Sequence, residues 1–232
     1  MRLEVLIMGK INCRGHEKRI ALCELYDIKP EFRIKQLSGI TISDSGGRIT
    51  DELFIFSAFS KQDGSFYDKI ICGEPTAKDF LMITGADRPP LFNMLKSVSK
   101  PTKEKSSKEK KSSSPSESTN APMYSKEDFS EWHPVNKALY NAIMILIICW
   151  GDVSGDSVLF KQRNRCIRYK GFYPYSDRIM SVNTMIGKSR HKTLAGILEY
   201  LKEKGNDIKD FTPELELLHE AVLKCGVASN IM

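Results

Sequence analysis

The sequence predicts an α+β protein: a small antiparallel β-rich N-terminal domain with one helix, a flexible linker, and an all-α C-terminal domain of four to five helices. Three observations support this class. Short runs of β-branched and aromatic residues fill the first part of the chain, a Lys- and Ser-rich stretch follows, and apolar stripes at helical spacing fill the rest. The predicted boundaries are a β-rich module over 1–96, a disordered linker over 97–126 and an α-helical module over 127–232.

Five short runs predict the strands of the N-terminal module. The sequences LSG, SDSGG and QDGS between them favour turns. The predicted strands are 2–8, 19–26, 31–37, 52–59 and 66–72. The last two meet across Gln62–Ser65, where the Asp63-Gly64 pair predicts a hairpin. We expect a small antiparallel sheet or partial barrel, which oligonucleotide-binding folds use among many others.

One helix is predicted after the last of these strands. Pro75 suits the first turn of a helix, because the N–H that proline lacks would have no helical partner there. Ala77, Phe80 and Leu81 form an apolar stripe, and Gly85 is placed to end the helix. This helix should pack on one face or end of the sheet.

The stretch 97–126 has the composition of a flexible tether. Its only branched aliphatic residue is Val98, and Pro101 and Pro115 interrupt a repetitive mixture of Ser, Lys and Glu. Such a segment has little apolar surface to offset the entropy of ordering. It carries +4 of the net charge of +6. Because Glu residues interleave with the Lys residues, the pattern favours a solvated tether over an arm that grips a polyanion.

The C-terminal module has the periodicity of a helical domain. Pro134 predicts the start of a helix that Gly151 ends, and its 138–150 stretch is apolar nearly all round, so it should be central. Further helices are predicted over 178–186, 192–205 and 212–226, with Thr212 as the N-cap of the last.

The cellular location follows from the absence of export signals and from cysteine usage. The N-terminal residues lack the apolar core and cleavage site of a signal peptide, and the longest apolar run, 142–150, is less than half the length that spans a bilayer. The six cysteines are widely spaced and contain no C-x-x-C pair. We therefore expect reduced thiols, a cytoplasmic location and no membrane insertion.

A metal site remains one open hypothesis. Cys13, His16, Cys23 and Cys72 are four soft ligands in one module, a number that suits zinc. Against this, Cys23 lies in a predicted strand and Cys72 at a strand end, where free cysteine commonly packs as a small hydrophobe. We expect no metal and no cofactor.

Catalytic motifs do not emerge from the sequence. GKS at 187–189 resembles the end of a phosphate-binding loop, but Val182 stands where the earlier glycine is required. The run from Asp152 begins like a calcium loop, yet Arg163 occupies the position of the bidentate Glu. The serines and histidines lack a G-x-S-x-G context. We expect a binding protein that is not an enzyme, and an enzyme of an unfamiliar type is the third alternative.

The stretch 161–192 is strongly basic and aromatic. It holds nine Lys or Arg residues against the single acid Asp177, within a module of net charge +1. Phe160, Phe172 and Tyr175 are among the aromatic residues that interleave with the charges, as stacking on single-stranded bases requires. The candidate binding residues are Lys161, Arg163, Arg165, Arg168, Tyr169, Lys170, Tyr173, Lys188, Arg190 and Lys192.

Two functions fit this organisation. The preferred one is a non-enzymatic, two-domain cytoplasmic protein that contacts DNA or RNA through 161–192, because polarised basic surfaces attract polyanions. The alternative is an adapter or accessory subunit of a multiprotein assembly, in which the patch meets an acidic protein and each module binds a different partner.

Overall fold

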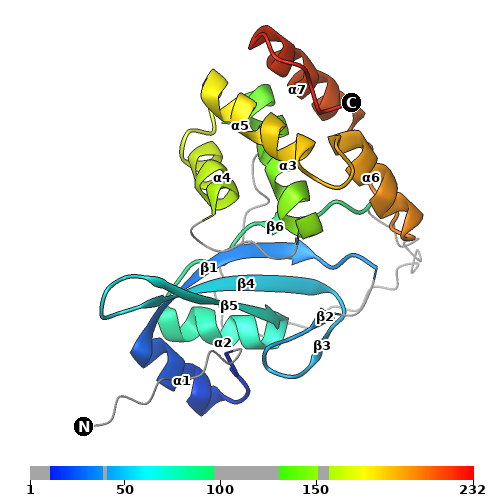
Figure 1. Cartoon of the computed structure of the whole chain (residues 1–232). Coiled ribbons are helices and arrows are strands. Elements are labelled where there is room, and N and C mark those ends of the chain that lie inside the picture. The colour runs from blue at the N-terminus through cyan, green and yellow to red at the C-terminus, as the bar shows by residue number, and fades with distance from the viewer. Residues whose placement is uncertain (1–10, 39–40, 97–130, 151–156) are drawn as a thin grey trace, which may run out of the picture.

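The computed structural model describes residues 11–38, 41–96, 131–150 and 157–232, which form three layers (Figure 1). A twisted sheet lies in the middle. Two N-terminal helices, α1 and α2, pack on one face, and the C-terminal helices α3–α7 lie over the other (Figure 1). The α+β class predicted from the sequence is therefore observed.

The central sheet has four strands in the order β5-β4-β1-β6. Their bounds are β1 Tyr26–Lys35, β4 Glu52–Ser60, β5 Phe66–Gly73 and β6 Leu91–Phe92. The predicted strands 31–37, 52–59 and 66–72 and the hairpin across Gln62–Ser65 are confirmed. The expectation of a purely antiparallel sheet is wrong, because β6 pairs parallel with β1 after α2 carries the chain across the sheet. A small ribbon of β2 (Thr41–Ile42) and β3 (Arg48–Ile49) stands beside it.

Alternation along β4 divides the two faces of the sheet. Phe54 and Phe56 join the core with α2, while Leu53 and Ile55 pack on the side of the C-terminal helices. Successive side chains of a strand point to opposite faces, so these four consecutive residues pack into both layers. In β1 the register with β4 shifts between Pro30 and Phe32, which leaves Glu31 as the extra residue of a bulge.

The N-terminal region contains two helices where one was expected. Residues 19–26 were predicted as a strand, but α1 spans His16–Leu25. The run HEKRIALCEL contains Ile20 as its only β-branched residue, and Glu, Lys, Arg, Ala and Leu favour helix. The prediction of a strand over 2–8 falls outside the described residues.

The predicted helix after β5 is confirmed as α2, Glu74–Thr84. Pro75 stands in its first turn, and Gly85 ends it with a left-handed conformation at φ 65°. Glycine reaches that conformation without the steric penalty of a side chain.

Five helices form the described part of the C-terminal region. They are α3 Pro134–Trp150, α4 Val158–Arg168, α5 Ser176–Gly187, α6 Leu194–Glu203 and α7 Thr212–Lys224. α3 is buried along most of its length and lies at the centre of this layer, as its apolar sequence predicted. The predicted N-cap of α7 is shifted by one position, because Thr212 is already helical and Phe211 is the cap. Asp210 accepts the Thr212 N–H at 2.9 Å.

The sheet and the C-terminal helices share one apolar core. Phe32, Phe92 and Met94 from the N-terminal region belong to the same cluster as Leu139 and Phe160. The chain segments that follow β6 and α6 also pair: Lys209 donates its backbone N–H to Met94 at 2.8 Å, and Lys96 donates to Asp207 at 2.8 Å. The two regions thus pack on one another. Whether each folds alone stays a prediction, and the linker predicted over 97–126 lies outside the described residues.

Within the described ranges, no helix is long and apolar enough to cross a membrane.

Candidate nucleic-acid interface

Helix α4 places the basic stretch with its cations on one face. Ser157 caps the helix by accepting the Phe160 N–H at 3.2 Å. Leu159, Phe160 and Cys166 then point into the core, while three cations lie on the exposed side. These cations are Lys161, Arg165 and Arg168, spaced at i, i+4 and i+7, which is the repeat of one helix face.

The turn between α4 and α5 is fixed by hydrogen bonds from the side chain of Asn136 of α3. This buried amide donates to the carbonyl oxygens of Cys166, Tyr169 and Lys170 at 3.1, 2.9 and 3.2 Å. The His133 N–H donates to the Lys170 carbonyl at 2.8 Å. Hydrogen bonds to the last carbonyls of a helix replace the intrahelical partners that are missing there. The turn is therefore fixed to the central helix, although its side chains project outward.

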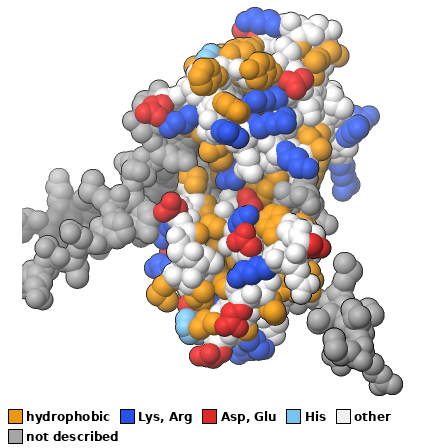
Figure 2. All heavy atoms as spheres, turned by 90° about the vertical axis from the view of Figure 1, so that its left-hand side faces the viewer, with side chains coloured by type: hydrophobic (Ala, Val, Ile, Leu, Met, Phe, Trp, Pro, Cys, Tyr) orange, Lys and Arg blue, Asp and Glu red, His pale blue; other side chains and the backbone are white. Residues whose placement is uncertain are grey.

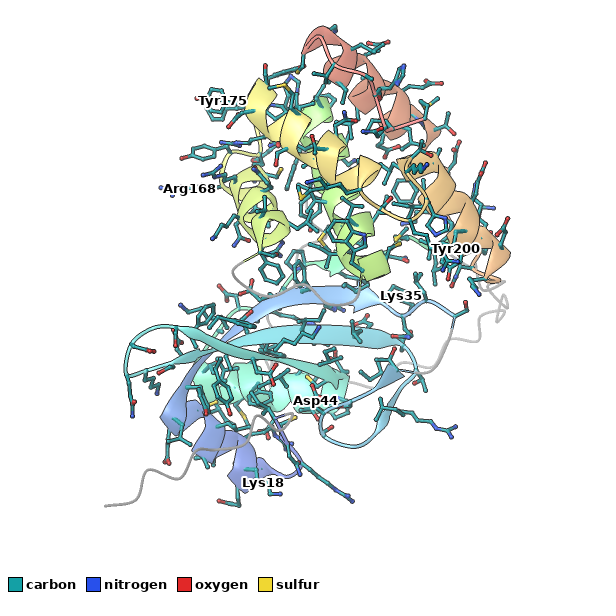
Figure 3. All side chains as sticks on the ribbon, viewed as in Figure 1. Lys18, Lys35, Asp44, Arg168, Tyr175 and Tyr200 are labelled. Atoms are coloured by element: carbon teal, nitrogen blue, oxygen red, sulfur yellow. The ribbon has the colours of Figure 1, made fainter. Side chains whose placement is uncertain are left out.

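Four aromatic rings project from this turn. Phe172 and Tyr175 are each 72% exposed, and Tyr169 and Tyr173 are also exposed. Figure 2 shows hydrophobic side chains gathered beside Lys and Arg side chains on this face of the molecule. Figure 3 shows Arg168 and Tyr175 pointing away from the helices on the same side. Rings so exposed contribute little to the core and are available to a ligand.

Two arginines organise the rings. The Arg178 guanidinium lies 5.4 Å from the ring centre of Tyr169 and 5.2 Å from that of Tyr175. Arg178 is only 7% exposed, so it supports the two rings from beneath. Arg168 lies 5.6 Å from the Tyr169 ring centre from the exposed side. Contacts of this kind attract a cation to the ring face and restrict the ring's orientation.

Most of the cations on this face have no acidic partner within the part of the chain that the structure describes. Among the described residues, no carboxylate lies within ion-pair distance of Lys161, Arg165 or Arg168, whereas Lys170 pairs with Glu131 at 2.5 Å. We call this face the basic-aromatic surface. Its residues are Lys161, Arg165, Arg168, Tyr169, Lys170, Phe172, Tyr173 and Tyr175.

Arg163 is one of the predicted binding residues, but it lies away from this surface. It is 7% exposed and turned toward the sheet, where its Nη2 donates to the Glu31 carbonyl at 2.7 Å. Its guanidinium lies 4.6 Å from the ring centre of Phe32 and its Nη1 lies 3.8 Å from Glu31 Oε2. Burial raises the pKa of the Glu31 carboxyl, and the nearby Arg163 charge partly offsets that effect. Arg163 therefore joins the helices to the sheet.

Three further candidates stand at the opposite end of α5. Lys188, Arg190 and Lys192 are exposed, but the twelve-residue helix Ser176–Gly187 separates them from the aromatic turn. A helix of this length spans about 18 Å at 1.5 Å per residue. The predicted patch is thus divided into two groups, and the aromatic rings accompany only the first.

Phe172 and Tyr175 interleave with the charges in the sequence but are not among the predicted binding residues. The structure makes them the most exposed rings of the surface. Phe160, which also interleaves with the charges, is instead a core residue that meets Phe32 edge to face at 4.6 Å between ring centres. The helical spacing of Leu159, Phe160 and Cys166 was the signal in the sequence that could have distinguished the buried ring of Phe160 from the exposed rings.

The four residues of the zinc hypothesis do not form a ligand set. His16 Nδ1 lies 2.8 Å from Asp79 Oδ1, and Cys13 and Cys72 are buried. Burial raises the pKa of the Cys13 thiol to about 11, and it also raises the pKa of Cys72, which favours the protonated forms. Across the described part of the chain, no group of three or more His, Cys, Asp or Glu side chains is arranged to hold a metal ion.

Comparisons with known proteins give no indication of function, so the function is inferred from the geometry of the structure. No protein-family model matches the sequence, and no curated protein or solved structure is significantly similar to the chain. The fold and the surface define an α+β protein with a layered helix–sheet–helix architecture and an exposed basic-aromatic face.

Proposed function

We propose that the protein binds single-stranded nucleic acid through the basic-aromatic surface and acts as a non-enzymatic cytoplasmic binding protein. The observation that carries the proposal is the pair of rings Phe172 and Tyr175, each 72% exposed, on a turn that buried hydrogen bonds fix. Bases of any sequence can stack on such rings, because every base has a π-face.

Cations and rings have complementary roles in this proposal. Lys161, Arg165 and Arg168 neutralise phosphates along the exposed face of α4, and Phe172 and Tyr175 receive the bases. A single strand can present bases and phosphates to one surface at once, whereas a duplex keeps its bases stacked inside. The surface should therefore bind single strands more tightly than duplexes, and it should bind single-stranded RNA and DNA about equally.

The test measures fluorescence anisotropy of labelled single-stranded and double-stranded oligonucleotides at low salt. The double substitution Phe172→Leu/Tyr175→Leu keeps apolar side chains but removes the rings. We expect it to cost about 1–3 kcal/mol of binding free energy for each stacked base, for single strands alone. The matched control is Met82→Leu, since Met82 is also 72% exposed but lies on α2, on the other side of the sheet.

Two results would reject the proposal. One is the absence of measurable affinity for any oligonucleotide at low salt. The other is equal affinity of the wild type and the ring variant for single strands. Either result would favour the adapter function instead, in which an acidic protein partner contacts the same cations.

A further inference from the structure

A cavity of about 700 Å³ lies between the sheet and the helical layer, away from the basic-aromatic surface. Its floor consists of sheet residues, among them Ile34, Leu53, Ile55 and Ile71, and its far wall consists of Ile147 and Ile148 of α3 with Tyr200 and Leu201 of α6. Its volume falls within the range of roughly 300–1,000 Å³ that small-molecule sites occupy. Figure 3 shows Lys35 on the sheet and Tyr200 on α6 on either side of this space.

The wall of the cavity is held in place by hydrogen bonds and ring contacts. Asn206 accepts the Ser38 N–H through Oδ1 at 2.6 Å and donates through Nδ2 to the Leu201 carbonyl at 2.8 Å. The Tyr200 ring packs against His191 at 4.5 Å between ring centres. Residues fixed in this way can form a site before a ligand arrives, which lowers the entropic cost of binding.

The lining has one sign of charge. Lys35, Lys69 and Lys204 line the cavity, and none of the described residues that line it is Asp or Glu. Lys35 also pairs with Asp51 outside the cavity, and the Lys204 ammonium lies 5.3 Å from the ring centre of Tyr200. An apolar space whose charged lining residues, among those described, are all lysines favours a ligand that combines an apolar body with an anionic group.

We propose that this cavity binds an apolar carboxylic acid of the fatty-acid type. The hydrocarbon chain lies against Ile55, Ile71 and Ile147, and the carboxylate meets the ammonium group of Lys204 at the edge. Burial of the chain supplies most of the binding free energy, while the lysines select the anion.

The test is calorimetric titration of the full chain with laurate and with dodecyltrimethylammonium, both below their micelle concentrations. The two amphiphiles have the same chain and opposite charges. We expect laurate to bind with a stoichiometry of one, and dodecyltrimethylammonium to bind at least roughly tenfold more weakly, since a charge-assisted hydrogen bond contributes about that factor. Ile148→Trp, which fills the cavity, should abolish laurate binding.

Charge reversal at two lysines at the C-terminal end of α6, Lys202 in its last turn and Lys204 at its C-cap, supplies a matched pair. Lys204→Glu should weaken laurate binding roughly tenfold or more, whereas Lys202→Glu, also exposed but outside the cavity lining, should leave it unchanged. Both lysines are exposed, so this pair decides the matter even if Ile148→Trp fails to fold. Absence of laurate binding, equal affinity for the two amphiphiles, or equal affinity of the two lysine variants would overturn the proposal.

Discussion

The two sides of α4 use the same kinds of residue for opposite purposes. Toward the sheet, Arg163 and Phe160 are buried against Glu31 and Phe32. Toward solvent, Arg165 and the ring of Phe172 on the turn beyond are exposed. On the side facing the sheet, arginine and phenylalanine thus form a packing contact between two layers. On the side facing solvent, the same two residue types form an exposed surface.

The difference shows that composition alone does not distinguish a binding patch from a packing contact. A guanidinium can stack on an aromatic ring and bond to carbonyl oxygens inside a protein as readily as it contacts a phosphate outside. What separates Arg163 from Arg165 is the helical phase, which turns one residue toward the sheet and the other away from it. Substitutions on the two sides should therefore affect different quantities.

The largest contrast is expected between two phenylalanines. Phe160→Ala should lower the free energy of unfolding by about 3–5 kcal/mol, because it removes a ring that is 2% exposed and leaves a cavity beside Phe32. Phe172→Ala should change it by less than about 0.5 kcal/mol. Urea denaturation followed by circular dichroism measures both. Similar losses in the two variants would break the distinction between the inner and outer sides.

A smaller contrast is expected between two arginines. Arg163→Ala removes the partner of a mostly buried carboxylate. It should cost about 2–3 kcal/mol of stability, below the usual range for buried pairs because the charged atoms are 3.8 Å apart. Arg165→Ala should leave stability nearly unchanged and weaken oligonucleotide binding. Denaturation and anisotropy titrations on both variants check this. If Arg165→Ala destabilised the protein as much as Arg163→Ala, the outer position would be structural as well.

The smallest effect concerns pH and the carboxyl of Glu31. Burial raises its pKa above the ordinary value near 4.5, so the folded protein binds this proton more tightly than the unfolded chain does. Stability from this group is fully present below pH 4.5 and is lost as pH rises through the raised pKa. The stability of the wild type relative to Glu31→Gln should therefore fall over that interval, measured by denaturation at several pH values. A relative stability that rises with pH would mean that attraction to Arg163 outweighs burial.

The elements that the sequence predicted are those with local signals. Asp63-Gly64 marked the hairpin, and Gly85 marked the end of α2 and adopts φ 65° there. α1 was mistaken for a strand because a short apolar run such as RIALCELY carries too few residues to separate the two periods. α4 was not predicted at all, since its dense charges concealed the stripe of Leu159, Phe160 and Cys166.

The candidate site was only partly predictable for a related reason. The basic and aromatic composition of 161–192 indicated a surface, and Arg165, Arg168 and the rings of the turn do lie together. The role of Arg163 depends on Glu31 and Phe32, more than a hundred residues earlier in the chain. The cavity likewise forms from β1, β4, α3 and α6. No local sequence pattern predicts a cavity between segments that are so far apart in the chain.

The salt dependence of single-strand binding tests the central claim most directly. The slope of log K against log salt concentration reports how many phosphates the protein neutralises. For Arg165→Gln/Arg168→Gln, we predict a slope that is shallower than that of the wild type by roughly 1.4, or about 0.7 for each lost contact. The control Lys188→Gln/Arg190→Gln, which removes two exposed cations beyond the far end of α5, should keep the wild-type slope. Equal slopes in the wild type and the Arg165/Arg168 variant, or equal losses in the two variants, would contradict binding at the basic-aromatic surface.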